Sequence, residues 1–239
     1  MRRFLFWSLC FCLLFPVGLS SCDGSDSAAV IFGGTTGKLT WTLTEDGVLT
    51  ITGEGPMPDY RDGGTSETPP WYPHVNRISS LTIGEGVTRI GDYAFMLCSF
   101  VTEVVIPESV TSMGDWAFGF STGLQEAYIG DGVTEIAAKA FAECTALKTV
   151  VIGKSIQRIG DQAFNTRSSW DQMTLEKITV LFDDIASGSF PVLESGSRGV
   201  FPKPGGWDLV SYKIYVPKGT KAEYQKNWSD YSSLIVEMQ

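Results

Sequence analysis

Residues 106–118 read Ile106-Pro-Glu-Ser-Val-Thr-Ser-Met-Gly-Asp-Trp-Ala-Phe118, and the same pattern recurs along the chain every 23 residues. The register is fixed by four phenylalanines, each preceded by an alanine: Phe95, Phe118, Phe141 and Phe164. A fixed period of 20 to 30 residues is typical of a solenoid, in which no unit can bury its apolar face without the next. Residues 83–164 therefore predict a stack of short coils, and the flanking segments are expected to cap it.

Each coil also contains one predicted strand, with the spacing L-x-x-V-x-I. In one copy these positions are Leu147, Val150 and Ile152. The last two lie two residues apart, which is strand alternation, so both are expected to point inward. Stacking pairs such strands in parallel and predicts one narrow sheet along one side. On the other side we expect a tight turn and a short helical or 3₁₀ segment, with Gly91 and its equivalents at a backbone position that other residues would strain.

The pattern becomes irregular toward its C-terminal end. It continues to Val180, after a five-residue insertion within residues 165–173. Beyond Val180 the coil is shortened, and Ile185 and Phe190 keep the five-residue spacing between the apolar position and the phenylalanine. These two residues are therefore expected to take the core positions of the last coil.

Two strings, residues 106–118 and Cys144-Thr-Ala-Leu-Lys-Thr-Val-Val-Ile152, resemble the BspA-type leucine-rich repeat family of bacterial surface proteins. The resemblance extends over about residues 77–190. It implies a leucine-rich-repeat solenoid of about five coils, an α/β-type repeat with short parallel strands and mostly β and irregular or 3₁₀ coils. It also implies a role in attachment or recognition at the cell surface, and it implies no catalytic residues.

The first 21 residues have the composition of a signal peptide. Arg2 and Arg3 precede an apolar core, and Leu19-Ser-Ser-Cys22 follows it. The cleavage region resembles a bacterial lipobox, which predicts lipid attachment at Cys22; the alternative is an ordinary secretory signal that ends near a cysteine. Residues 22–30 would be a tether. These features predict an exported lipoprotein, anchored at the cell surface or outer membrane.

Residues 31–76 are predicted to form an N-terminal β cap. Two strand-like runs, residues 39–43 and 48–51, are separated by Asp46-Gly47, which favours a hairpin. A solenoid needs such a cap to cover the apolar end of its stack.

Residues 191–239 are predicted to form the C-terminal cap. The segment 213–216 reads as one more strand, and 220–228 as a short helix with a capping box of Thr220 and Glu223. Tyr224 and Trp228 lie four residues apart, so one helix face can close the stack.

Cys98 and Cys144 would remain after signal removal and lipidation. They occupy the same repeat position two coils apart, so their Cα atoms should be separated by about twice the strand spacing of about 4.8 Å. That exceeds the limit of about 7 Å for a disulfide. We therefore expect two buried, free thiols.

Enzyme motifs are weak in this chain, and we expect neither catalysis nor a cofactor or metal. Gly119-Phe-Ser-Thr-Gly123 matches a nucleophile elbow, but Ser121 is the repeat equivalent of the two cysteines. The single histidine, His74, lies in the predicted cap loop. Asp183 and Asp184 could bind calcium but are more often a solvated loop. The net charge of −9 argues against a nucleic-acid partner.

The outward positions of the predicted strands form two columns and are the candidate partner-binding surface. One column contains Thr82, Val105, Tyr128, Val151 and Thr179, and the other contains Ser80, Glu103, Glu126, Thr149 and Lys177. The residues proposed to bind a partner are Tyr128, Val105, Val151, Glu103, Glu126, Lys177 and Thr179. The alternative is that these residues are ordinary half-exposed strand positions, selected for β propensity.

The sequence thus predicts a lipid-anchored leucine-rich-repeat protein that binds a macromolecular partner, protein or surface polysaccharide and possibly from a host, through its strand face. We expect the protein itself to be a monomer. One alternative is a structural or envelope-assembly lipoprotein, and a less favoured one is a carbohydrate-active enzyme that uses paired carboxylates.

Overall fold

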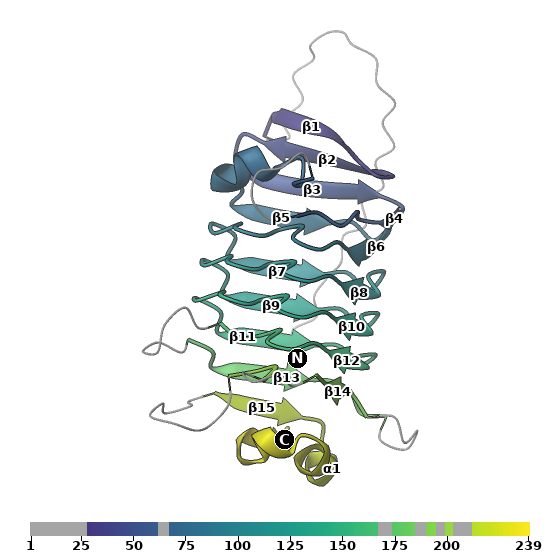
Figure 1. Ribbon diagram of the computed structural model, residues 1–239, viewed down its shortest axis with the longest axis vertical. Helices are drawn as coiled ribbons and strands as arrows, with labels where there is room; N and C mark the ends of the chain where they lie inside the picture. Colours follow the sequence, from purple (N-terminus) through teal and green to yellow (C-terminus); the bar gives the residue numbers. More distant parts are fainter. Residues whose placement is uncertain (1–27, 62–66, 167–173, 185–189, 195–198, 203–211) are drawn as a thin grey trace.

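A computed structural model describes residues 28–61, 67–166, 174–184, 190–194, 199–202 and 212–239. The predicted signal peptide and Cys22 lie outside these ranges. The described strands are stacked as rungs along one long axis (Figure 1). The chain is therefore a solenoid, as the 23-residue period predicts.

Parallel pairing between neighbouring coils builds two sheets rather than one. The long-strand sheet contains β7 (Glu103–Ile106), β9 (Glu126–Ile129), β11 (Thr149–Ile152), β13 (Lys177–Val180), β15 (Lys213–Val216) and β16 (Ile235–Glu237). The short-strand sheet contains β4 (Gly55–Pro56), β6 (Val87–Ile90), β8 (Ser112–Met113), β10 (Glu135–Ile136), β12 (Arg158–Ile159) and β14 (Val192–Leu193). We expected one strand per coil, and that expectation was wrong: the side predicted to hold a turn and a short helical or 3₁₀ segment contains the short-strand sheet.

The second sheet arises because stacking aligns the same backbone groups in successive coils. The amide of Gly114 donates to the carbonyl of Ile90 at 2.9 Å, and that of Ala137 donates to Met113 at the same distance. Each coil thus satisfies backbone groups that burial would otherwise leave unpaired. In Figure 1 the strands β8, β10 and β12 lie at one edge of the stack.

At Gly91 and Gly114 the glycine after the short strand is needed for space rather than for its backbone angle, although Ala137 takes the same repeat position in the next coil. A Cβ on Gly91 would lie 1.7 Å from the carbonyl oxygen of Pro58, and on Gly114 it would lie 2.2 Å from a carboxylate oxygen of Asp92. Neither glycine has a positive φ. The predicted reason, backbone strain, was therefore wrong. Left-handed backbone occurs instead in the turns that follow, at Tyr93, Trp116, Lys139 and Gln162, and again at Leu97, Phe120 and Glu143.

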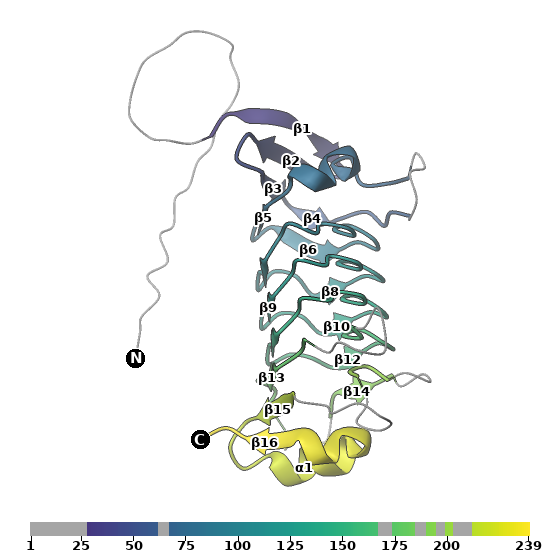
Figure 2. The same cartoon turned by 90° about the vertical axis from the view of Figure 1, so that its left-hand side faces the viewer.

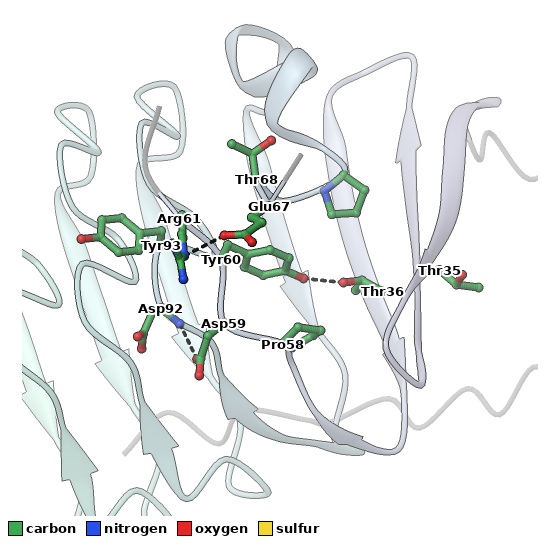
Figure 3. A pocket seen from close by; sticks show the side chains of 11 residues that line it. Thr35, Thr36, Pro58, Asp59, Tyr60, Arg61, Glu67, Thr68, Asp92 and Tyr93 are labelled. Atoms are coloured by element: carbon green, nitrogen blue, oxygen red, sulfur yellow. Dashed lines mark hydrogen bonds and ion pairs between the residues drawn. The ribbon is translucent and has the colours of Figure 1, made fainter. Parts of the chain in front are cut away.

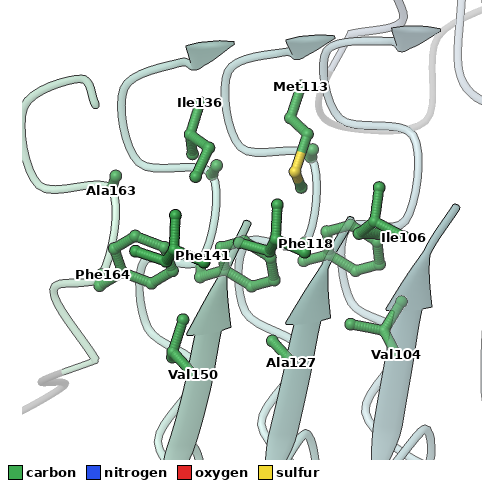
Figure 4. Close-up of a cluster of buried hydrophobic side chains, with 14 of the residues drawn as sticks. Val104, Ile106, Met113, Phe118, Ala127, Ile136, Phe141, Val150, Ala163 and Phe164 are labelled. Carbon is green, nitrogen blue, oxygen red and sulfur yellow. The ribbon is translucent and has the colours of Figure 1, made fainter. Parts of the chain in front are cut away.

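The core is a ladder of stacked rings between the two sheets (Figure 4). Phe95, Phe118, Phe141 and Phe164 stack with centroids 5.1 to 5.2 Å apart, and all are buried. The aliphatic residues of both strand sets surround them, including Val150 and Ile136. Aromatic stacking adds to the burial energy of these large side chains.

The ladder ends differ from the sequence prediction. Phe201, not Phe190, stacks on Phe164, with ring centroids 5.4 Å apart. Leu193 pairs with Ile159 in the short-strand sheet and so takes the preceding core position, while Ile185 lies outside the described residues. Phe190 instead contacts Tyr224 edge-on at 4.7 Å. The coil pattern therefore continues past residue 190.

At the N-terminal end, the predicted hairpin is confirmed and a further strand precedes it. The strands β1 (Val30–Thr36), β2 (Leu39–Thr44) and β3 (Val48–Gly53) are antiparallel, and β3 then pairs in parallel with β5 (Ser80–Ile83). The 3₁₀ helix η1 (Tyr72–Arg77) follows Trp71, whose ring stacks on Phe95 at 5.6 Å. Figure 2 shows this cap above the stacked coils.

At the C-terminal end, the predicted strand and helix are both present. The helix α1 (Lys221–Asn227) leads to the 3₁₀ helix η3 (Ser229–Leu234) and to β16, which pairs with β15. Tyr224 and Trp228 are buried and close the stack, as expected. The capping box is absent: the Thr220 hydroxyl donates to the Pro217 carbonyl at 2.7 Å and caps no helix amide.

Candidate interaction surface

The outward side of the long-strand sheet, called the strand face below, contains the predicted columns in register. Val105, Tyr128, Val151 and Thr179 are successive partners, and so are Glu103, Glu126, Thr149 and Lys177. The first members, Thr82 and Ser80, belong to β5, which pairs with β3 in a separate sheet.

Two further members of these columns were missed. Tyr215 pairs with Thr179, and Lys213 pairs with Lys177, because β15 adds a fifth rung. No repeat motif surrounds this strand, so its register could not be assigned from the period. Its alternation of inward Ile214 and Val216 was the only available signal.

Exposure differs strongly among the candidate residues. The side chain of Val105 is 57% exposed, whereas Thr179 is only 8% exposed and offers little to a partner. Tyr128 and Val151 are half-buried between their neighbours. The apolar part of the strand face therefore lies on β7, β9 and β11, with half-buried Tyr215 on β15 beyond Thr179.

Tyr128 and Glu126 form a local pair on β9. The Tyr128 hydroxyl donates to Oε2 of Glu126 at 2.5 Å. This hydrogen bond, together with partial burial and the nearby carboxylates, raises the pKa of Tyr128 to about 12. The phenol is neutral at physiological pH and its hydroxyl is held by its own neighbour Glu126, so Tyr128 can serve as an ordered contact residue.

A second exposed aromatic group lies on the turns that connect the sheets. Trp116 and Phe120 stack with centroids 5.4 Å apart, and the Lys139 ammonium lies 5.2 Å from the Trp116 ring. All three residues have left-handed backbone. Because one ring face of Trp116 meets Phe120 and a cation lies over the ring, this group is largely occupied by its own contacts.

A cleft of about 780 Å³ lies beside the N-terminal cap (Figure 3). Its polar groups are paired with one another: Tyr60 with Thr36 at 2.5 Å, and Arg61 with Glu67 at 2.7 Å. A carboxylate oxygen of Asp59 accepts the backbone N–H of Asp92 at 3.0 Å. These pairings favour a structural role for the cleft walls.

The residues of the enzyme motifs have structural contacts. Ser121 is 1% exposed and donates to the carbonyl of Phe95 at 3.0 Å, and Cys144 makes the equivalent contact with Phe118 at 3.1 Å. His74 stacks on Phe32 at 3.7 Å. A nucleophile elbow requires an exposed serine, so Ser121 does not fit that role.

Cys98 and Cys144 are free and buried, as predicted. Across the described ranges, no cluster of three or more His, Cys, Asp or Glu side chains is placed to hold a metal ion. Nor does any helix in that part of the chain combine the length and apolar character needed to cross a membrane.

Parallel strands on a 23-residue coil, filled by aliphatic side chains and a phenylalanine ladder, define a leucine-rich-repeat solenoid. The family of BspA type leucine rich repeat regions matches residues 72–190 in six copies, one more than the coils expected from the sequence. The chain belongs to this family, and the resemblance seen in the sequence is confirmed.

Solved structures of bacterial proteins share the fold. A leucine-rich repeat protein from Eubacterium ventriosum is 27% identical with a TM-score of 0.55; the match covers 79% of this chain and 44% of that protein. The pneumococcal vaccine antigen PcpA is 16% identical with a TM-score of 0.54, over 83% of this chain and 46% of its own. The chain thus spans less than half of either protein. None of the curated proteins compared with it matches.

Proposed function

We propose that this protein is a non-enzymatic, lipid-anchored surface protein that binds a macromolecular partner through the strand face. One observation carries the proposal. The outward row of β7, β9 and β11 combines exposed Val105 with half-buried Tyr128 and Val151, beside a column of charged side chains. An apolar centre with a charged margin is the usual arrangement of a protein interface.

The anchoring part of the proposal depends on the N-terminal sequence. A basic start, an apolar core and a small-residue segment before Cys22 support export followed by lipid attachment. Acyl chains on that cysteine would hold the solenoid at a membrane surface. The proposed partner is a protein or a surface polysaccharide, and the proposed site is the cell surface.

Binding is tested with cells that display matched variants. Tyr128→Ala combined with Glu126→Lys removes the aromatic contact and reverses one charge on the strand face. Glu108→Lys combined with Gln157→Ala likewise reverses one charge and truncates one side chain, at exposed positions away from the strand face. We expect only the first variant to lose adhesion to matrix or neighbouring cells, with circular dichroism unchanged in both. Equal adhesion by both variants would refute the role of the strand face.

Surface location is tested separately. Intact cells are treated with an impermeable protease, and the protein is followed by immunoblot. Loss of the band supports display on the outside. Protection in intact cells would contradict it and would favour a support role inside the envelope.

A further inference from the structure

The charges of the strand face are segregated by sign along the stack. In the column that contains Glu103, called the charged column below, Glu103 on β7 is the register partner of Glu126 on β9. In the same column, Lys177 on β13 is the partner of Lys213 on β15. Thr149 on β11 separates the two pairs. Read along the coils, the column is therefore acidic, acidic, neutral, basic, basic.

This arrangement does not stabilise the single chain. Like charges directly opposite each other on neighbouring strands are destabilising, and neighbouring strands are about 4.8 Å apart. Within the described part of the chain, Glu103 and Lys213 form no ion pair, and Lys177 lies only over the ring of Tyr215 at 5.2 Å.

The short-strand sheet shows the opposite arrangement. There Glu135 and Arg158 are register partners of opposite sign and form an ion pair. Arg158 also contacts Glu194 at 2.9 Å. Charges on that side are thus neutralised along the stack, whereas those of the strand face form no ion pairs among the described residues, and Glu126 accepts only the Tyr128 hydroxyl.

We propose that the partner of the strand face is a second copy of this chain, packed face to face about a twofold axis that runs along β11. Such an axis keeps the strand direction and reverses the order of the coils. Each column then meets itself in reverse order. Glu103 lies opposite the partner subunit's Lys213, and Glu126 lies opposite the partner subunit's Lys177. Because the twofold axis repeats each contact, the two glutamates and two lysines of each subunit form four ion pairs in the dimer.

The other column, which contains Val105, Tyr128 and Val151, is compatible with the same axis. Val151 on β11 meets its own copy at the centre, and the exposed Val105 lies opposite the partner subunit's Tyr215. Tyr128 lies opposite the rung of the partner subunit's Thr179, which is only 8% exposed and adds little to the contact. The charged column thus borders an apolar one, as in known interfaces.

The interface is small, which predicts a weak dimer. Five rungs span roughly 19 Å, and a four-residue strand spans roughly 13 Å, so the contact is smaller than the standard interface of about 800 Å² per partner. Many copies on one surface would strengthen it by avidity. This inference rests on the proposed function and names the partner of the strand face. In the antiparallel dimer the N-terminal ends of the two subunits point in opposite directions, which suits contact between proteins anchored on two facing surfaces.

Sedimentation equilibrium of the full-length protein in detergent tests the proposal. We expect a dimer that forms with rising protein concentration and weakens with rising salt. Glu103→Lys with Glu126→Lys gives an all-basic column, and Lys177→Glu with Lys213→Glu gives an all-acidic one. Each should self-associate at least about tenfold more weakly, and an equimolar mixture of the two should recover wild-type association. Glu85→Lys with Glu108→Lys, at one repeat position in the turns, should dimerise like wild type.

A wild-type protein that stays monomeric, or a mixture that associates no better than its components, would overturn the self-recognition proposal. The cell-adhesion experiment keeps the two proposals distinguishable. If the Tyr128→Ala, Glu126→Lys variant still loses adhesion while the wild type is monomeric, the strand face binds a different partner.

Discussion

Phe201 stacks on Phe164 with the two rings 14° from parallel, although the residues are 37 positions apart in the chain. The aromatic ladder therefore extends into the segment that was expected to be only a cap. Trp71 extends it in the same way at the other end, where its indole N–H donates to the carbonyl of Ala94 at 2.8 Å. Both caps thus continue the core of the repeats rather than simply covering it.

Replacement of Phe201 should therefore destabilise the whole solenoid. Phe201→Ala removes a fully buried ring between Phe164 and Trp228 and should lower the free energy of unfolding by about 3–5 kcal/mol. Phe100→Ala is the matched control, because that side chain is 58% exposed, and it should change stability by less than about 0.5 kcal/mol. Urea denaturation measures both. Equal effects would contradict the extended ladder.

Gly91 should not tolerate even one methyl group. In Gly91→Ala the new Cβ would lie 1.7 Å from the carbonyl oxygen of Pro58, so two coils would have to separate. We expect a loss of more than about 2 kcal/mol. At Gly219 the backbone has φ of +84° but no atom lies within 4 Å of the added Cβ. Gly219→Ala should cost only the left-handed strain of about 1–2 kcal/mol. If Gly219→Ala were the more harmful change in thermal unfolding, the steric explanation would fail.

The repeat position of Ser121 should accept cysteine. Ser121→Cys can keep the contact with the Phe95 carbonyl, since Cys144 makes the same contact one coil later. Ser121→Ala removes the hydroxyl donor from that buried carbonyl, which then keeps only the Cys98 amide at 3.4 Å, and should cost about 0.5–1.5 kcal/mol. We expect the alanine variant to unfold at lower denaturant concentration than the cysteine variant, with adhesion unchanged in both. Loss of adhesion in a folded Ser121→Ala variant would instead indicate a functional serine.

The sequence was sufficient to predict features that the repeat determines. The four phenylalanines, the inward positions such as Val150 and the outward columns all follow from the 23-residue period, because each position has the same environment in every coil. Cys98 and Cys144 were predicted to be free for the same reason. The strand-face candidates could thus be placed, although their binding remains a prediction.

Features that depend on single contacts could not be predicted. The short strands have two residues in most coils, too few for a visible alternation. In the last coil Phe201 lies eight positions after Leu193, so a search for a spacing of five positions led to Phe190 instead. The charge segregation of the strand face appears only when Lys213 is aligned with Lys177, and no motif marks that alignment.

Alkaline pH should destabilise the fold through its buried thiols. Burial raises the pKa of Cys98 from its ordinary value of 9.0 to about 12, and burial likewise raises the pKa of Cys144 to about 12. Below pH 9 both states hold these protons, so the thiols add no pH dependence. Between about pH 9 and 12 the unfolded chain loses protons that the folded chain keeps, so stability falls by up to about 1.4 kcal/mol per pH unit for each thiol. Urea titrations at pH 8, 10 and 11 measure this slope.

The variant with both Cys98→Ala and Cys144→Ala separates the thiols from other alkaline groups. Buried tyrosines such as Tyr60, whose pKa is also raised to about 12 by burial, add to the same slope in the wild type and in the variant. We therefore expect a shallower but still negative dependence without the cysteines. In the wild type at pH 8, a thiol reagent should modify Cys98 and Cys144 only as fast as the protein opens, because a buried neutral thiol is a poor nucleophile. Immediate modification of the folded protein, or an unchanged slope in the double variant, would show that these coils open to water far more readily than their packing implies.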